Sequence, residues 1–327
     1  AIDHETGRCR LIATGFPETN QGARERRATA RLDAFARLLE APAPPEPAVP
    51  SPPLRWRSNF DRQAYEAAVE TVRDYIRAGD IYQANIAQRF TAELPPGFGP
   101  FALYRRLRAT NPATFGAYLA FEGLSIASSS PERFLKLSGR EVETRPIKGT
   151  VRRVDDPDED RRRAQALLAD PKERAENIMI VDLLRNDLSR ICEPHSVRVP
   201  TLCGLESYAS VHHLVSVVTG TLRAGLDALD LVAATFPGGS ITGAPKLRAM
   251  DIITEIEGDA RELYCGAIGA IGFDGSLDTS IAIRTVFMDD RTAVLQAGGG
   301  ITLLSEPGPE YEETLTKAAR VFQAFEG

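Results

Sequence analysis

The chain alternates between two spacings of apolar residues, one typical of helices and one typical of strands. Apolar side chains recur at helical spacing from Tyr65 to Ile76, and Gly79 ends that pattern. The next segment, Ile81 to Phe90, alternates residue by residue, which predicts a strand. One face of this strand is apolar, whereas the other carries two amides, Gln83 and Asn85. We therefore predict a helix followed by a strand with one polar face.

The same spacing rules predict helices and strands over most of the remaining chain. Strands are expected at 115–121, 124–127, 134–137, 142–145, 197–201, 214–222, 267–273, 280–288 and 293–297. Helices are expected at 155–169, 171–189, 226–236, 244–256 and 309–325. Runs of strands with interspersed helices favour an α+β fold with mainly antiparallel sheets.

The first part of the chain has a different composition. Seven prolines lie between Ala41 and Pro53, and such a stretch favours extended polyproline II over a helix or a sheet. We interpret 41–54 as a linker, 1–40 as the remnant of an N-terminal region with a helix at 23–40, and 55–327 as the main functional domain. The chain begins at Ala1 without a basic and apolar leader, which indicates a trimmed protein and not a secreted one.

Composition narrows the class of protein and of partner. Apolar residues make up 43% of the chain and charged residues 26%, which is typical of a folded globular protein. The net charge of -6 disfavours nucleic acid as the main partner, because phosphate binding requires a basic surface. No apolar stretch approaches the roughly 20 residues that span a bilayer, so no membrane segment is predicted. The four cysteines are scattered, which argues against a zinc site or a disulfide framework and favours the cytoplasm.

Two carboxylates on one predicted helix are the first candidates for chemistry. Glu173 and Glu176 are three residues apart and therefore share a helical face. Glu310, Glu312 and Glu313 begin another helix near the C-terminus, where one of them could meet that pair. Mg2+ prefers such hard oxygen ligands. Two solvated surface charges are the alternative, although the apolar run after Glu176 favours a helix that enters the protein interior.

The glycine-rich segments and single polar residues are ambiguous when each is taken alone. Glycine permits close backbone approach to a ligand, but a run such as Gly298 to Gly300 is most often a turn. The segment SITGAPK, 240–246, lacks the spacing of a P-loop, so binding of a nucleoside triphosphate is not expected. Arg284 interrupts an apolar strand and fits either a carboxylate clamp or an internal salt bridge. For His213, a structural role is the commoner alternative to catalysis.

Ten segments, taken together and in order, resemble one enzyme family. They are GDIYQANIAQRF (79–90), SSPERFLKL (129–137), TRPIKGT (144–150), ERAENIMIVDLLRNDLSR (173–190), VHHLVS (211–216), FPGGSITGAPKLRAM (236–250), LYCGAIG (263–269), SIAIRT (280–285), GGGI (298–301) and EYEETLTKA (310–318). With these motifs the chain resembles the chorismate-utilising enzymes, and among them the aminodeoxychorismate synthases. The resemblance implies that 55–327 is a chorismate-binding catalytic domain of two facing, mainly antiparallel sheets with helices on the outside.

The resemblance also implies roles for individual residues. Glu176 and Glu313, with Glu173 close by, would bind Mg2+, which would hold the ring carboxylate of chorismate. Lys148, Glu132 and His213 would be the catalytic residues. The positions that bind substrate or line its pocket would be Gln83, Thr150, Ser240, Tyr264, Arg284, Gly298, Gly299, Gly300 and Lys317.

Two positions in the resemblance select the reaction. Gln83 stands where relatives that add water to chorismate have a lysine base, which implies ammonia as the nucleophile. Lys148 stands where anthranilate synthases have a small residue, which implies amination at C4 to aminodeoxychorismate, for para-aminobenzoate and folate synthesis. In the family mechanism this lysine attacks C2, and Glu132 would protonate the departing C4 oxygen.

Lys148 and Glu132 both need unusual pKa values for these roles, because the reference values are about 10.4 for lysine and 4.3 for glutamate. We expect burial to raise the pKa of Glu132 and, together with Mg2+, to lower that of Lys148. Without the resemblance, Lys148 would be interpreted as a solvated turn residue, since it precedes Gly149.

The nitrogen source points to a partner subunit. Free ammonia is scarce at neutral pH and the chain has no reactive-cysteine motif with a partnered histidine, so we expect a glutamine amidotransferase subunit to supply ammonia. Two alternatives stay open: an anthranilate synthase, which would aminate C2 and release pyruvate, and a non-catalytic paralogue that binds a chorismate-like ligand or only a partner. Relatives have a longer N-terminal region, which in several members binds tryptophan, and here only 1–40 could represent it.

Overall fold

The chain divides into two compact units, Ala1–Ala48 and Val49–Gly327. The structure, a computed structural model, describes residues 1–3, 6–42, 54–208 and 211–326. Most of the expected linker at 41–54 lies outside these described residues. Within the described ranges, no helix combines the length and the apolar character that crossing a membrane requires.

The small unit contains a short hairpin and one helix. Strand β1 (Ile2–Asp3) pairs antiparallel with β2 (Arg8–Cys9), and α1 (Gln21–Glu40) follows. The Asn20 side chain accepts a hydrogen bond from the Ala23 backbone N–H and so caps the start of this helix. No residue of α1 is buried. The helix expected at 23–40 is confirmed, but it has no core of its own.

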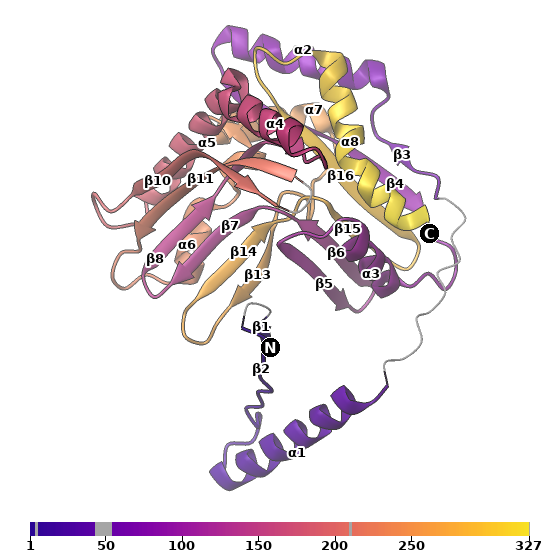
Figure 1. Cartoon of the computed structure of the whole chain (residues 1–327), viewed down its shortest axis with the longest axis vertical. Coiled ribbons are helices and arrows are strands. Elements are labelled where there is room, and N and C mark those ends of the chain that lie inside the picture. Colours follow the sequence, from indigo (N-terminus) through magenta and orange to yellow (C-terminus); the bar gives the residue numbers. More distant parts are fainter. Residues whose placement is uncertain (4–5, 43–53, 209–210, 327) are drawn as a thin grey trace. The chain divides into compact units, whose positions relative to one another are not determined.

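The large unit is built on two antiparallel sheets (Figure 1). The first sheet contains β7 (Arg133–Ser138), β8 (Glu141–Arg145), β9 (Ile147–Arg152), β10 (Arg198–Ser207), β11 (Val211–Thr221), β13 (Ala267–Ile271) and β14 (Leu277–Ile281). The second contains β3 (Arg57–Ser58), β4 (Gln83–Glu93), β5 (Phe115–Phe121), β6 (Leu124–Ser130), β12 (Gly243–Ala244), β15 (Thr285–Met288) and β16 (Thr292–Ile301). Their orders are β10-β11-β8-β7-β14-β13, with β9 also on β11, and β12-β4-β16-β15-β6-β5, with β3 also on β4.

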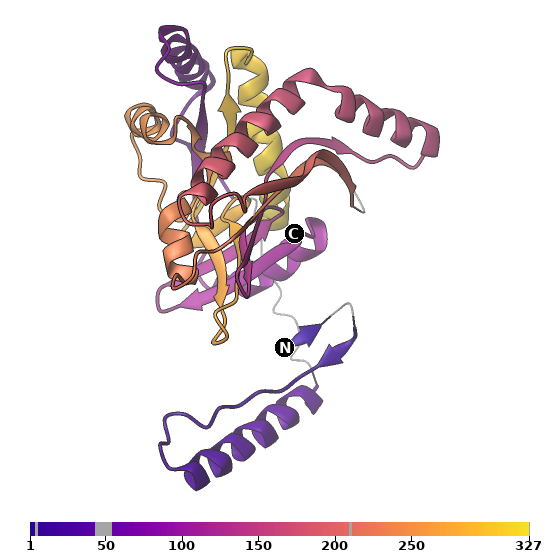
Figure 2. The ribbon, with the colours of Figure 1, turned by 90° about the vertical axis from the view of Figure 1, so that its left-hand side faces the viewer.

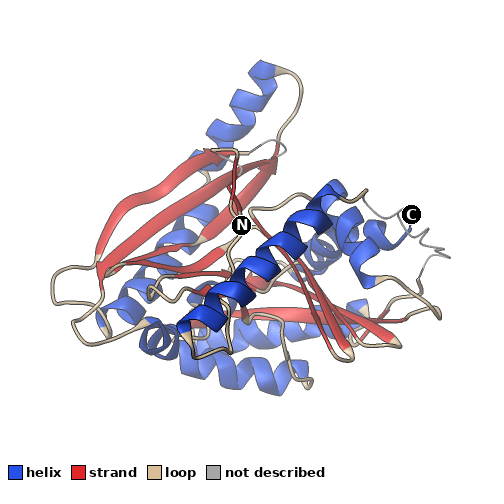
Figure 3. Cartoon of the chain, turned by 90° about the horizontal axis from the view of Figure 1, so that it is seen from below, coloured by secondary structure: helices blue, strands red, loops and turns tan. Residues whose placement is uncertain are grey.

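Helices lie outside both sheets (Figure 3). Packed with the second sheet are α2 (Arg62–Ala78), α3 (Pro100–Thr110), α7 (Lys246–Glu257) and α8 (Pro307–Glu326). With the first sheet lie α4 (Pro157–Ala169), α5 (Pro171–Ser189) and α6 (Ala228–Thr235), and Figure 2 shows α4 and α5 following one another. The expected α+β fold of two mainly antiparallel sheets with outer helices is confirmed.

Helix α2 shows how local sequence sets these elements. The Asp61 side chain accepts from the Ala64 N–H at its start, and Gly79 adopts a left-handed conformation with φ 84° at its end. Its residues Tyr65 and Val69 are fully buried against β4 and α7, as the helical spacing predicts. The two amides predicted on one face of β4 therefore point away from this helical layer.

The prediction of one continuous strand at 280–288 is wrong, and the difference changes the position of Arg284. Its first half, β14, belongs to the first sheet, and its second half, β15, belongs to the second. Arg284 lies in the crossover between them with φ 49°, and not within a strand. The chain makes a similar crossover from β6 to β7, which carries Glu132. The Ile281 N–H donates to the Glu132 carbonyl at 3.1 Å, so the two crossovers are bonded to each other.

Three further differences separate the structure from the prediction. Helix α3 and strand β9 were not expected, although Leu103 and Leu107 show the helical spacing of α3. The glycine run Gly298 to Gly300 is the end of strand β16 and not a turn. Lys148 is on β9, so its interpretation as a solvated turn residue is excluded.

Candidate active site

Lys148 joins both sheets to α5 through one shared carboxylate. Its Nζ donates to Oε1 of Glu176 at 2.6 Å, and Nε2 of Gln83 donates to the same oxygen at 2.8 Å. Glu176 comes from α5, Gln83 from β4 of the second sheet and Lys148 from β9 of the first. The side chains of Lys148 and Glu176 are only 13% and 11% exposed. The structure therefore brings three of the predicted site residues together in the interior.

The protonation of Lys148 differs from our expectation. Burial by itself lowers the pKa of Lys148, but the attraction and hydrogen bond of Glu176, with the charges of Glu132 and Glu173, outweigh it and raise that pKa. Burial thus acts in the predicted direction, but the predicted net lowering is wrong for the chain without Mg2+. The lysine is held as an ammonium, and its use as a nucleophile requires the Glu176 contact to change.

Glu132 is a buried carboxyl group suited to proton donation. Its exposed fraction is 6%. Burial raises the pKa of Glu132, and the hydrogen bond with Ser240 and the charge of Lys148 offset this only in part. Ser240 lies in the 3-10 turn Gly239–Ile241. The expected direction for Glu132 is thus confirmed, and it can hold a proton beside the Lys148 amine.

His213 lies next to Lys148 in the first sheet. It pairs with Thr150 between β11 and β9, and its Nδ1 lies 2.8 Å from Oγ1 of Thr150. Burial, assisted by the positive charge of Arg284, lowers the pKa of His213 to about 4. The imidazole is therefore neutral at physiological pH.

Arg284 lies in the crossover between the sheets, with no matching carboxylate among the described residues. Burial and the charge of Arg320 lower its pKa, while Glu132 opposes this. Among the described residues, no carboxylate lies within 4.0 Å of its guanidinium, so the internal salt bridge is not found there. Ser129 donates its N–H to the Arg284 carbonyl at 3.1 Å, which fixes the backbone of the crossover. The arrangement leaves the guanidinium available to an anionic ligand.

Several carboxylates gather beside this cluster. Burial raises the pKa of Glu173, and the charges of Glu176 and Glu313 raise it further. For Glu313, burial is outweighed by Lys317, whose Nζ lies 2.6 Å from its Oε1, and the pKa is lowered. Lys317 also donates to the Gly298 carbonyl at 2.8 Å. These carboxylates are thus close enough to affect one another's charge.

The carboxylates of Glu173, Glu176 and Glu313 have the chemistry to bind a hard divalent cation, but their positions do not form a coordination site. Carboxylate oxygens that repel one another are the ligands that Mg2+ binds and neutralises. Yet no three His, Cys, Asp or Glu side chains in the described ranges are placed to coordinate one ion. Glu176 is occupied by Lys148 and Gln83. Magnesium binding by Glu173, Glu176 and Glu313 therefore stays a prediction.

Two of the three glycines of β16, Gly299 and Gly300, make room for these side chains. A Cβ on Gly300 would collide with Nε2 of Gln83 and would lie 2.7 Å from Oε1 of Glu176. One on Gly299 would lie 3.2 Å from Oε2 of Glu310. Glycine is required at 300 because a side chain there would displace Gln83 or Glu176.

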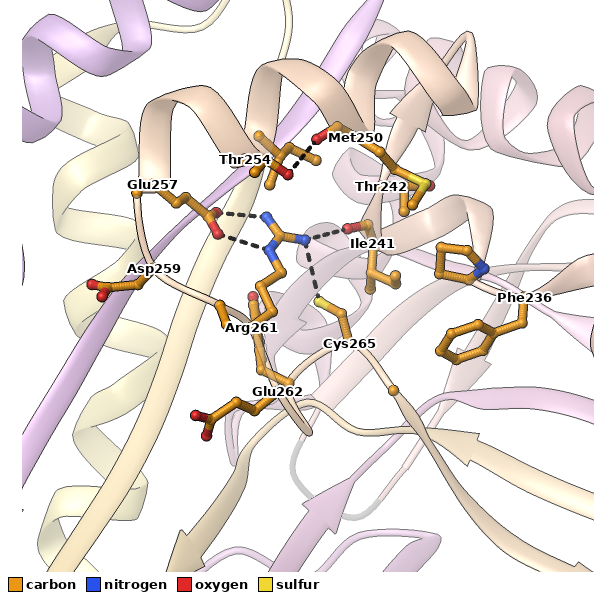
Figure 4. A pocket seen from close by; sticks show the side chains of 16 residues that line it. Phe236, Ile241, Thr242, Met250, Thr254, Glu257, Asp259, Arg261, Glu262 and Cys265 are labelled. Carbon is orange, nitrogen blue, oxygen red and sulfur yellow. Dashed lines mark hydrogen bonds and ion pairs between the residues drawn. The ribbon is translucent and has the colours of Figure 1, made fainter.

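A cavity of about 500 Å³ lies beside Tyr264 (Figure 4). Lys148 is not among the residues that line it. Arg261 forms part of its wall: the guanidinium donates to both oxygens of Glu257 and to the carbonyls of Ile241 at 3.0 Å and Asn85 at 2.6 Å. The ring of Tyr264 lies 5.5 Å from this guanidinium. The structure thus groups Tyr264 with Arg261, and no hydrogen bond among the described residues joins Tyr264 to the Lys148 cluster.

Arg261, Glu257 and Asn85 were missed as functional candidates. The spacing of Glu257 and Arg261 by four residues was a signal for an ion pair, although α7 ends between them. Asn85 was noted on the polar face of β4 but was given no role. Arg261 ties β4 to the turn that carries Ser240, so it positions two walls of the site.

Comparison with known proteins places this geometry in a family. The model of the chorismate binding enzymes matches residues 1–323. The chain is 46% identical over 296 residues to aminodeoxychorismate synthase component 1 of Klebsiella aerogenes, which covers 90% of this chain and 65% of that protein. It is 45% identical over 271 residues to anthranilate synthase component 1 of Aquifex aeolicus, which covers 83% of this chain and 54% of that protein. The chain thus spans between about half and two thirds of the length of these relatives.

A solved structure supports the same placement. Anthranilate synthase component I from Streptococcus pneumoniae matches with a TM-score of 0.87 and 38% sequence identity, over 98% of this chain and 71% of that one. The resemblance seen in the ordered motifs is therefore confirmed by sequence and by fold. This chain belongs to the family of chorismate-binding enzymes.

Proposed function

We propose that this chain aminates chorismate at C4 to give 4-amino-4-deoxychorismate. The observation that carries the proposal is the buried amine of Lys148, which lies among Glu176, Gln83 and the protonatable Glu132. The relatives alone do not choose the reaction, because synthases of both kinds match at 46% and 45% identity. A lysine at this position distinguishes the C4 reaction, since C4 amination benefits from a nucleophile at C2.

The reaction can be written with this chain's own groups. The neutral Lys148 amine forms a bond to C2 of chorismate, the ring double bonds shift, and the C4–O bond breaks as Glu132 gives its proton to the leaving oxygen. Ammonia then attacks C4, the electron pairs return, and the C2–N bond to Lys148 breaks. Water and the regenerated lysine are the by-products. Glu132 supports its step because burial raises its pKa and so favours the protonated form.

The other predicted residues would bind and orient the substrate. Arg284 and the backbone of Gly298 to Gly300 would hold substrate carboxylates, with Tyr264 and Lys317 nearby, while Ser240 and the neutral His213–Thr150 pair would line the ring. Mg2+, when bound by Glu173, Glu176 and Glu313, would hold the ring carboxylate and disfavour the ammonium form of Lys148. Ammonia would come from a glutamine amidotransferase subunit, in the cytoplasm.

A product assay tests the proposal directly. The chain is incubated with chorismate, MgCl2 and ammonium salt, and the product is then treated with aminodeoxychorismate lyase. We expect para-aminobenzoate, and no turnover without Mg2+. The high fold similarity to an anthranilate synthase component favours the second candidate, amination at C2. Fluorescent anthranilate with pyruvate release before the lyase is added would establish that candidate instead, and no product of either kind would indicate a non-catalytic paralogue.

A further inference from the structure

Strand β4 carries a buried amide that the proposed reaction does not use. Asn85 is 7% exposed and lies two residues after Gln83, on the same face of the strand. Its Oδ1 is fully buried, and no hydrogen-bond donor among the described residues reaches it. Oε1 of Gln83 is also buried and has no donor among the described residues. The amide of Gln83 bonds only through its Nε2, which donates to Glu176. Two neighbouring carbonyl oxygens thus share one face and lack donors.

The backbone around Asn85 is fixed, so this oxygen cannot find a partner by a shift of the strand. The Asn85 N–H donates to the Thr242 carbonyl at 2.8 Å, and its own carbonyl accepts from Arg261 at 2.6 Å. On the neighbouring strand it stands opposite Gly300, which has no side chain to offer. Buried acceptors in proteins are almost always paired with protein or ligand. The pairing for Asn85 must therefore come from a molecule bound in the site.

The chemistry of the two oxygens defines that molecule. Residues i and i+2 of a strand are roughly 7 Å apart, so a small species between them can donate to both. Chorismate offers one hydroxyl donor and two carboxylates, and the carboxylates would be repelled by carbonyl oxygens and by Glu176. Ammonia offers three N–H donors. It is the one reactant of the proposed function whose donors match two acceptors beside the Lys148 amine.

We propose that Oε1 of Gln83 and Oδ1 of Asn85 together bind the ammonia that attacks the substrate. This inference rests on the proposed function and adds a binding residue, Asn85, to it. The two amides hold the nitrogen by its hydrogens and leave its lone pair free to react.

Steady-state kinetics with ammonium salt as the nitrogen donor tests this pair. The variants are Asn85→Leu, which keeps the size and removes the acceptor, and Asn85→Ala, which removes the acceptor without placing a larger apolar side chain in the site. We expect the KM for ammonium to rise by about tenfold or more in both, with the KM for chorismate within about twofold of wild type. Saturating ammonium should restore kcat, since the reacting groups are intact.

The outcomes separate this inference from the function on which it rests. If wild type gives the aminated product and both variants keep the wild-type KM for ammonium, Asn85 does not bind ammonia, and its partner is a water molecule. An equal rise in the KM for chorismate would place Asn85 against chorismate and overturn the inference. If wild type gives no aminated product at all, the proposed function fails first, and this inference fails with it.

Gln88→Met is the matched control on the same strand. Gln88 is also a buried amide of β4, but it faces the helical layer, where it bonds to Thr314 and Ser58. Its substitution should lower the melting temperature without changing the KM for ammonium. A rise in that KM equal to the rise in Asn85→Ala would show that general loosening of β4 explains the effect, and would overturn the inference.

Discussion

The two ends of α5 each hold a buried lysine–carboxylate pair, and they differ in what else the lysine touches. At the C-terminal end, Nζ of Lys246 donates to Asp187 at 2.6 Å and to the carbonyls of Thr235 at 3.0 Å and Pro237 at 2.8 Å. At the N-terminal end, Nζ of Lys148 has one partner among the described residues, Glu176. The first ammonium uses all three of its hydrogens, whereas the second uses one.

This difference separates an anchor from a site better than burial or distance does. Both lysine side chains are 13% exposed, and both ion pairs measure 2.6 Å. At the Lys148 end, hydrogen-bonding groups lack partners among the described residues: two hydrogens of the lysine and the side-chain oxygens of Gln83 and Asn85. Like charges there also raise the pKa of Glu173. We interpret the lysine whose hydrogen bonds are all made, Lys246, as part of the fold's support. We interpret the groups around Lys148 whose hydrogen bonds are not all made as positioned for a ligand.

The largest expected effect is on turnover in Lys148→Ala. Removing the proposed nucleophile should lower kcat by about 1,000-fold or more, with the KM for ammonium little changed. Stability should fall less than at the other end of α5, because Gln83 still donates to Glu176. Initial rates of chorismate consumption and a thermal melt measure both. Wild-type turnover in this variant would refute the role of Lys148. It would also refute the functional difference between the two ends of α5.

The opposite result is expected for Lys246→Met at the C-terminal end of α5. The substitution leaves Asp187, which is 3% exposed, without its cation, and should lower the free energy of unfolding by about 3 kcal/mol. Turnover per folded molecule should stay near wild type. The double variant Lys246→Met with Asp187→Leu should recover part of the loss, because no charge is then left buried. Urea titration measures each difference.

The sequence could predict α5 itself but not the difference between its ends. Its bounds, 171–189, follow from Pro171 at the first turn and from the Asp170 side chain, which accepts from the N–H groups of Lys172 and Glu173. Which hydrogens of Lys246 and Lys148 are used depends on loops and strands far away in the chain. The segment SITGAPK, which ends at Lys246, was compared only with a P-loop and rejected. Without the family motifs, Lys148 would have been interpreted as a solvated turn residue.

The errors in the fold prediction have the same origin. The run from Ser280 to Met288 is mainly apolar on both sides of Arg284, so spacing gives no sign that the chain changes sheets there. The glycine run at 298–300 was interpreted as a turn because the close approach of Gln83 and Glu176 to Gly300 is a contact between distant segments. Local pattern predicts elements, whereas the site depends on register and on crossovers between sheets.

A smaller effect is expected from pH, and only at the Lys148 end. Burial holds the pKa of His213 at about 4, below its ordinary value of 6.5, so the folded chain resists protonation. The stability from this group is complete above about pH 6.5 and is lost as the pH falls toward 4, with about 2 kcal/mol gone at pH 5. In His213→Gln this part of the pH dependence should disappear. Urea titrations at pH 8 and pH 5 give the free energy of unfolding of wild type and of His213→Gln. An equal change between the two pH values in both proteins would show that the pKa of His213 is not lowered by folding.

The smallest effect is expected midway along α5, where Arg185 pairs with Asp182 at 2.8 Å. This distance is close to those of the two buried pairs, but the side chains are 53% and 63% exposed. Water and salt screen such a pair, so Arg185→Ala should change the free energy of unfolding by less than about 0.5 kcal/mol and leave turnover unchanged. A loss comparable to that of Lys246→Met would mean that distance alone sets the strength of ion pairs on this helix. The contrast between its saturated and unsaturated ends would then have no energetic basis.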